Sequence, residues 1–80
     1  MTPEEKISRA NRAAQLLDDP LLKEAFDAIQ RDHFEEILSA KTDEDRARLA
    51  AEVRALRNVQ SWLKTVITTG KAAIARRDTA

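Results

Sequence analysis

The chain has 80 residues, and its 14 lysine and arginine residues balance 14 aspartate and glutamate residues, so the formal net charge is zero. Because such a chain has no summed field that attracts polyanions, we do not expect it to bind nucleic acid through bulk charge. It contains no cysteine, which excludes disulfides and thiolate metal sites. No apolar run approaches the roughly 20 residues of a membrane span, so no membrane association is expected either.

The composition favours helices throughout. One glycine, two prolines and 35% charged residues are typical of solvated helices and give few turn or strand signals. We therefore predict an all-α fold, with residues 1–80 forming a single helical domain. Eighty residues bury only a small core, so self-association is a natural source of further stability.

The first two helices have clear boundaries in the sequence. Thr2 is a hydroxyl N-cap followed by proline, which predicts a first helix over residues 3–17. Its apolar stripe consists mostly of alanine, so this helix needs a partner. Asp19 and Pro20 then start a second helix over residues 20–40, whose apolar positions recur at steps of three and four along a broad face.

A third helix is predicted over residues 43–68, capped by Thr42 and with three carboxylates in its first turn. The link before it is only a few residues long, which makes the second and third helices antiparallel neighbours. The predicted architecture is thus an antiparallel helical hairpin with a shorter N-terminal helix. Gly70 is either a left-handed residue that ends the third helix or a weak point inside one. We expect an end or a kink there, with a further short helix over residues 71–77.

No residue pattern indicates catalysis. His33 is the only histidine, and Gln30 stands where the Glu-x-x-His pair of a helical-bundle metal site needs a glutamate. We therefore interpret His33 as a half-buried structural residue. The serines lie on helices with no glycine-rich elbow nearby. We predict no catalytic residue, no metal ligand and no cofactor.

The segment from Thr68 to Lys71 offers hydroxyls, a glycine amide and a lysine that together suit a phosphate, although a plain helix terminus is the commoner explanation. Trp62 either stacks a base or, more commonly, fills the core. Two arginines precede this segment on the third helix. The candidate ligand-binding residues are Arg54, Arg57, Thr68, Thr69 and Lys71.

A surface of small residues suggests a helix contact. It is formed by Ala47, Ala50, Ala51 and Ala55. Such residues let another helix approach closely, so this face is either an oligomer contact or the surface that the first helix covers.

Three stretches carry a family resemblance. DDPLLKEAFDAI, DEDRARLAAEVRALRNV and SWLKTVITTGKAA occur in this order, and together they resemble short helical proteins encoded in the structural gene clusters of tailed bacteriophages. The likeness covers about residues 9–73. It departs late in the second helix, where Phe34 or Ile37 stands at a position expected to be tryptophan. A weaker, architectural likeness is to phage sponge proteins that sequester cyclic nucleotide signals, and no sponge residue transfers by position.

The resemblance implies a phage-encoded, non-enzymatic binding protein, an accessory of phage assembly or of the virion. The alternative is an anti-defence sponge for a cyclic nucleotide immune signal. The expected partners are further copies of the chain and either phage structural proteins or a small phosphate-rich ligand. The expected location is the cytoplasm of an infected bacterium or the virion.

Overall fold

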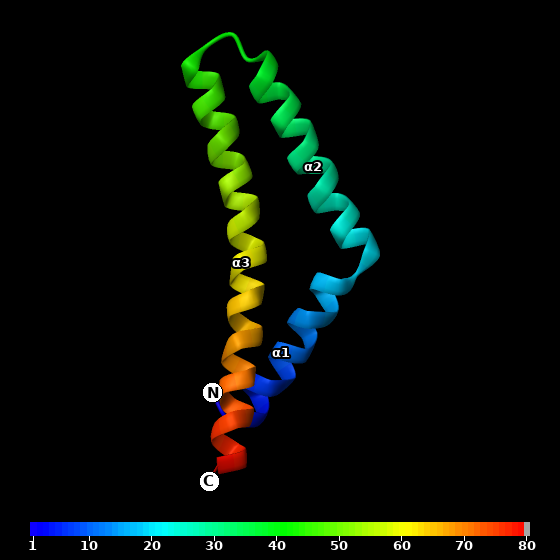
Figure 1. The fold of residues 1–80 in the computed structure, drawn as a ribbon, viewed down its shortest axis with the longest axis vertical. Helices are drawn as coiled ribbons and strands as arrows, with labels where there is room; N and C mark the ends of the chain where they lie inside the picture. Colours follow the sequence, from blue (N-terminus) through cyan, green and yellow to red (C-terminus); the bar gives the residue numbers. More distant parts are fainter. Residues whose placement is uncertain (80) are drawn as a thin grey trace.

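The computed structural model describes residues 1–79, and the regular structure of these residues is entirely helical (Figure 1). Helix α1 spans Pro3–Asp18, α2 spans Pro20–Ser39 and α3 spans Asp43–Thr79. The predicted all-α class is therefore confirmed. The first two helices end within one residue of the predicted positions, and the third helix is much longer than predicted.

Each helix begins where a side chain caps its first turn. The Thr2 hydroxyl accepts a hydrogen bond from the Glu5 amide at 3.1 Å. The Asp19 carboxylate accepts from the Leu22 amide at 2.9 Å, and the Thr42 hydroxyl accepts from the amide three residues on at 3.1 Å. These acceptors satisfy amides that have no partner within their own helix, so the sequence sets the start of each helix locally.

The prediction that the third helix ends at Gly70 is wrong. Helix α3 continues through Gly70 to Thr79, and the glycine has no positive φ. The predicted short helix over residues 71–77 is the last part of α3. A glycine inside a helix costs about 1 kcal/mol relative to alanine. A glycine is needed at this position because α1 approaches closely. A Cβ built on Gly70 would overlap the Ala10 Cβ and lie 3.0 Å from the Lys6 carbonyl oxygen.

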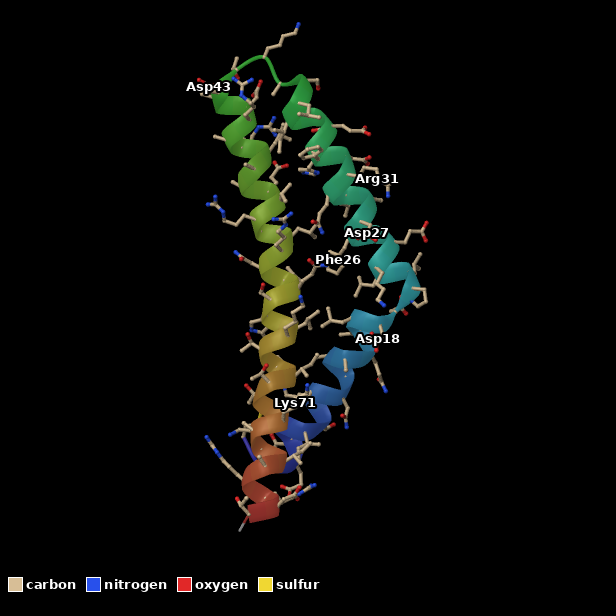
Figure 2. The ribbon with its side chains drawn as sticks, in the orientation of Figure 1. Asp18, Phe26, Asp27, Arg31, Asp43 and Lys71 are labelled. Carbon is tan, nitrogen blue, oxygen red and sulfur yellow. The ribbon has the colours of Figure 1, made fainter. Side chains whose placement is uncertain are left out.

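Helices α1 and α2 both pack against α3. Helix α2 lies beside the first half of α3, and α1 returns to the second half, so the N-terminus lies beside the second half of α3 (Figure 1). The molecule is elongated, at 58 × 24 × 16 Å. Helix α1 buries Ala10 and Ala13, and Leu63, Gly70 and Ala73 are buried on the second half of α3. Helix α2 buries only Phe26 (Figure 2), so it is held by fewer buried side chains.

Many large apolar side chains remain at the surface. No helix within the described residues is long and apolar enough to cross a membrane. Exposed apolar residues that gather in one place mark contact surfaces. The more exposed ones on the three helices are Leu16, Leu21, Ile29, Phe34, Leu38, Val59 and Trp62.

Candidate functional site: the groove between α2 and α3

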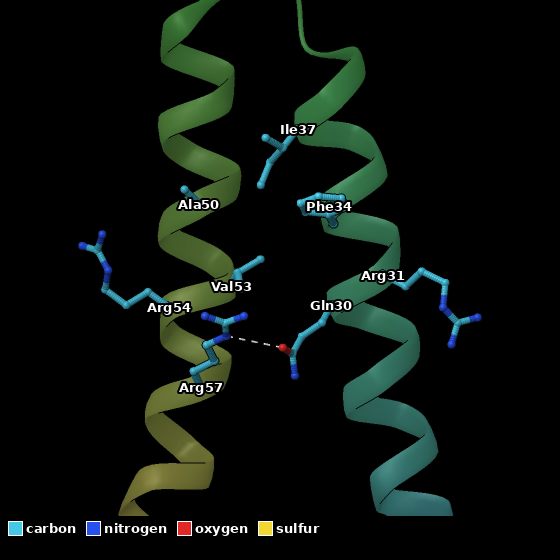
Figure 3. A pocket seen from close by; sticks show the side chains of 8 residues that line it. All are labelled: Gln30, Arg31, Phe34, Ile37, Ala50, Val53, Arg54 and Arg57. Carbon is cyan, nitrogen blue, oxygen red and sulfur yellow. Dashed lines mark hydrogen bonds between the residues drawn. The ribbon is translucent and has the colours of Figure 1, made fainter.

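A groove of about 510 Å³ opens along one side of the contact between α2 and α3 (Figure 3). Its apolar lining comes from both helices and consists of Phe34, Ile37, Ala50 and Val53. Phe34 is the largest of these side chains and is 61% exposed. The groove therefore presents an aromatic ring and aliphatic carbon to a ligand or partner.

The sequence creates this groove through helical register. Leu22, Phe26 and Ile37 follow one stripe of α2, and Phe34 lies to one side of that stripe because each residue advances about 100° around the helix. Phe34 is therefore placed at the flank of the contact rather than between the helices. Ala50 lines the groove from α3 with only a single methyl group, which leaves the space open.

Three arginines line the groove and no carboxylate does. Arg57 Nε donates a long hydrogen bond of 3.4 Å to Gln30 Oε1, across the two helices. Arg31 and Arg54 point away from the groove on opposite sides (Figure 3), and within residues 1–79 neither forms a side-chain hydrogen bond or salt bridge. The groove thus has an apolar floor with the Arg57 side chain beside it and a basic rim formed by Arg31 and Arg54, whose side chains project outward from its edges, and this combination suits a partner that is apolar and anionic.

The opposite side of the α2–α3 contact is tied by His33. Its Nε2 atom lies 2.7 Å from Glu52 Oε2, and its Nδ1 atom lies 2.9 Å from the Ile29 carbonyl oxygen. These hydrogen bonds, that to Glu52 first, raise the pKa of His33 above its ordinary value of 6.5, and the nearby charge of Glu36 adds to the effect. His33 therefore links α2 to α3 through Glu52, and its bond to the Ile29 carbonyl oxygen lies within α2.

The five predicted ligand-binding residues do not form one site. Arg54 and Arg57 line the groove, whereas Thr69 lines a separate pocket beside α1. Thr68 donates its hydroxyl to the Lys64 carbonyl oxygen at 3.1 Å, and Lys71 is exposed. At 1.5 Å per residue, Arg57 and Thr68 lie about 16 Å apart along α3. The segment Thr68 to Lys71 is helical throughout, so its interpretation as a helix terminus is wrong.

Of the eight residues that line the groove, sequence reasoning assigned only Arg54 and Arg57 to a ligand site. The six that it missed are Gln30, Arg31, Phe34, Ile37, Ala50 and Val53. The register of Phe34 relative to Ile37 is the signal that places Phe34 at the flank of the α2–α3 contact. The small-residue surface is exposed at all four alanines, and Ala50 lines the groove. Helix α1 does not bury this surface, because α1 packs farther along α3, near Leu63 and Gly70.

Trp62 differs from the expectation that a single tryptophan fills the core. It is 58% exposed and lies beside α1 at the second half of α3. Its register explains this position, because Trp62 directly precedes the buried Leu63 and therefore points about 100° away from it.

Comparisons with known proteins find no matching family model, and no curated protein or solved structure is similar enough to count as a match. The resemblance to phage proteins therefore stays a prediction. Within residues 1–79, no three histidine or carboxylate side chains are grouped so that they would hold a metal ion.

Proposed function

We propose that this chain is a non-enzymatic binding protein that self-associates through the α2–α3 hairpin, as an accessory of phage assembly or of the virion would. The observation that carries the proposal is the groove itself. Phe34 is 61% exposed on its apolar floor, beside three arginines and no carboxylate. Leaving this much apolar surface in water forgoes stabilisation that a bound partner would supply.

A second surface of the same chain complements the groove. Along α2, one exposed stripe recurs at steps of four, four, three and four residues and lies on the flank opposite Phe34. It begins with apolar residues and ends with two carboxylates, so it has the features of a helix that fits an apolar groove with a basic rim. The stripe consists of Leu21, Ala25, Ile29, Asp32 and Glu36.

Charge favours a contact between different surfaces of two copies. Two identical grooves placed face to face would bring the arginines of both copies together, which like-charge repulsion opposes. Docking the acidic stripe of one copy on the groove of another pairs opposite charges instead. Such a head-to-tail contact leaves a free groove and a free stripe at each end, so it closes into a ring or continues as a filament.

The test is a charge swap followed by light scattering after size exclusion. Arg31→Glu with Arg54→Glu removes the basic rim, and Asp32→Arg with Glu36→Arg removes the acidic stripe. We expect the unchanged protein to form oligomers and each double variant to be a monomer. Mixing the two variants should restore association, because each then offers the surface that the other needs.

A matched control makes the same change in net charge as the arginine variant, but away from the groove. Lys41→Glu with Lys71→Glu alters two exposed cations, and this variant should oligomerise like the unchanged protein. A monomeric unchanged protein at high micromolar concentration would contradict the proposal. So would variants that remain oligomeric, or a mixture that does not associate.

The alternative proposal, a sponge for a cyclic nucleotide signal, draws on the same groove, since Arg54 and Arg57 offer guanidinium groups that suit phosphates. A thermal-melt screen against cyclic di- and trinucleotides separates the two. A ligand at 100 times its dissociation constant adds about 2.7 kcal/mol, which raises the midpoint of a domain this small by roughly 10 °C or more. A flat response leaves self-association as the function of the groove.

A further inference from the structure

Trp62 and Arg9 form an exposed pair where α1 lies beside α3. The Arg9 guanidinium carbon lies 5.9 Å from the centre of the Trp62 ring, within the range of a cation–π contact. Arg9 Nη1 also lies 3.2 Å from Met1 Sδ. These contacts hold the guanidinium group beside an indole ring that remains 58% exposed.

A pocket of about 280 Å³ lies at this pair, between α1 and α3. Two cations, Lys6 and Arg9, line it from α1, and α3 contributes the hydroxyls of Thr65, which donates to the Ser61 carbonyl oxygen at 3.0 Å, and of Thr69. None of its lining residues is acidic. Within residues 1–79, Lys6 and Arg9 have no carboxylate partner and the Thr69 hydroxyl forms no hydrogen bond, so these groups are available to a ligand.

The three kinds of group match the parts of one class of small molecule. An exposed indole stacks a planar base, ammonium and guanidinium groups bind phosphate oxygens, and hydroxyls bind phosphate or sugar oxygens. We infer that this pocket binds a nucleotide, with Trp62 against the base and with Lys6 and Arg9 on the phosphate. Its volume lies just below the range of about 300 to 1,000 Å³ of most small-molecule sites, which favours one base with one phosphate.

The site is independent of the proposed self-association. It lies between α1 and the second half of α3, whereas the groove lies between α2 and the first half of α3. A protein that fails to oligomerise can therefore still bind a nucleotide here. The converse also holds, so the two proposals fail separately.

The chain provides its own reporter for this site, because Trp62 is its only tryptophan and it has no tyrosine. We would titrate the full chain with adenosine monophosphate and follow tryptophan fluorescence. Adenosine tests the base without the phosphate, and inorganic phosphate tests the anion alone. We expect saturable quenching by the nucleotide. The affinity for adenosine or for phosphate should be weaker than the affinity for the nucleotide by about tenfold or more.

Two variants test the assigned roles. Lys6→Ala and Arg9→Ala should each weaken nucleotide binding about tenfold, because each removes a charge-assisted hydrogen bond. Arg76→Ala, which changes an exposed arginine elsewhere on α3, is the matched control and should bind normally. Circular dichroism checks that each variant keeps its helices, and isothermal calorimetry gives the same constants without relying on fluorescence.

The inference would be overturned by the absence of saturable quenching at millimolar nucleotide. Equal affinities for adenosine and its monophosphate would also overturn it, since the cations would then play no part. The same conclusion follows if folded Lys6→Ala and Arg9→Ala proteins bind as tightly as the Arg76→Ala control.

Discussion

His33 Nε2 lies 2.7 Å from a carboxylate oxygen of Glu52, while its other ring nitrogen lies 2.9 Å from the Ile29 carbonyl oxygen. Both neighbours only accept hydrogen bonds, and a neutral imidazole has a single N–H to donate. Only the doubly protonated ring donates to both oxygens. The surroundings of His33 therefore favour its charged form, and loss of the second proton removes one of the two hydrogen bonds and the ionic attraction to Glu52 across α2 and α3.

The first prediction concerns pH. The pKa of His33 is raised above 6.5, first by Glu52 and then by the Ile29 carbonyl, with Glu36 adding to the effect. A raised pKa in the folded state means that the stabilisation is fully present below pH 6.5 and declines as the pH rises through the raised value. Arg48 Nη1 lies 3.4 Å from the other carboxylate oxygen of Glu52.

We would measure thermal midpoints of the unchanged protein and of His33→Gln at intervals between about pH 5 and pH 8. The difference between them should be largest at acidic pH and should shrink toward alkaline pH. Because His33 is the only histidine, the comparison isolates its titration. A difference that stays constant over this range would show that the charged form is not the one that links the helices.

The second prediction concerns Gly70. Gly70→Ala should gain about 1 kcal/mol from helix propensity. It should lose more than this from overlap with the Ala10 Cβ and the Lys6 backbone, so we expect a net destabilisation of about 1 to 3 kcal/mol. Chemical denaturation measures this change. Ala10→Gly removes one of the two obstructing groups, and combining both substitutions should recover part of the loss.

A double-mutant cycle then tests the close contact directly, since residues in contact do not behave additively. Additive effects of Gly70→Ala and Ala10→Gly would mean that α1 and α3 do not approach each other at this point.

The third prediction compares two phenylalanines of one helix. Phe26 is 8% exposed and Phe34 is 61% exposed. Phe26→Ala should cost about 3 kcal/mol or more, the usual cost of emptying a buried aromatic site. Phe34→Ala should change the free energy of unfolding of the dilute monomer by less than about 0.5 kcal/mol. At high concentration Phe34→Ala should weaken self-association, because it removes the main apolar surface of the groove. Equal losses of monomer stability would contradict the burial of Phe26.

The fourth prediction concerns the corner between α1 and α2. Asp19→Ala should cost about 1 kcal/mol, because the Asp19 carboxylate caps α2 through the Leu22 amide at 2.9 Å. Asp18→Ala is the matched control. Its carboxylate lies 3.9 Å from Lys23 and both side chains are exposed, so its loss should change stability by less than about 0.5 kcal/mol. Equal effects in urea denaturation would show that the cap does not stabilise α2.

The sequence predicted the helices where local chemistry sets them and failed where distant contacts do. Thr2, Asp19 and Thr42 lie beside the amides that they cap, so their roles follow from a few neighbouring residues. The role of Gly70 depends on Ala10, a residue of another helix, which no local pattern predicts.

The candidate groove shows the same division. Arg54 and Arg57 follow from the polar face of α3, whereas Phe34 and Gln30 belong with them only because α2 lies alongside. Trp62 was assigned to the core by residue type, and its register beside Leu63 places it outside. Residue type alone therefore indicated which side chains are charged or aromatic, but it did not indicate where in the structure they lie.

The order in which the helices settle on α3 follows from how the chain is connected. Only three residues separate α2 from α3, so these helices meet by closing a short loop, whereas α1 must find a segment near the opposite end of the chain. We expect the α2–α3 pair to form early and α1 to dock last. Yet α1 buries two side chains and α2 only one. The element that folds last is thus the better anchored one, and hydrogen exchange in the native state should protect the amides of α1 at least as well as those of α2.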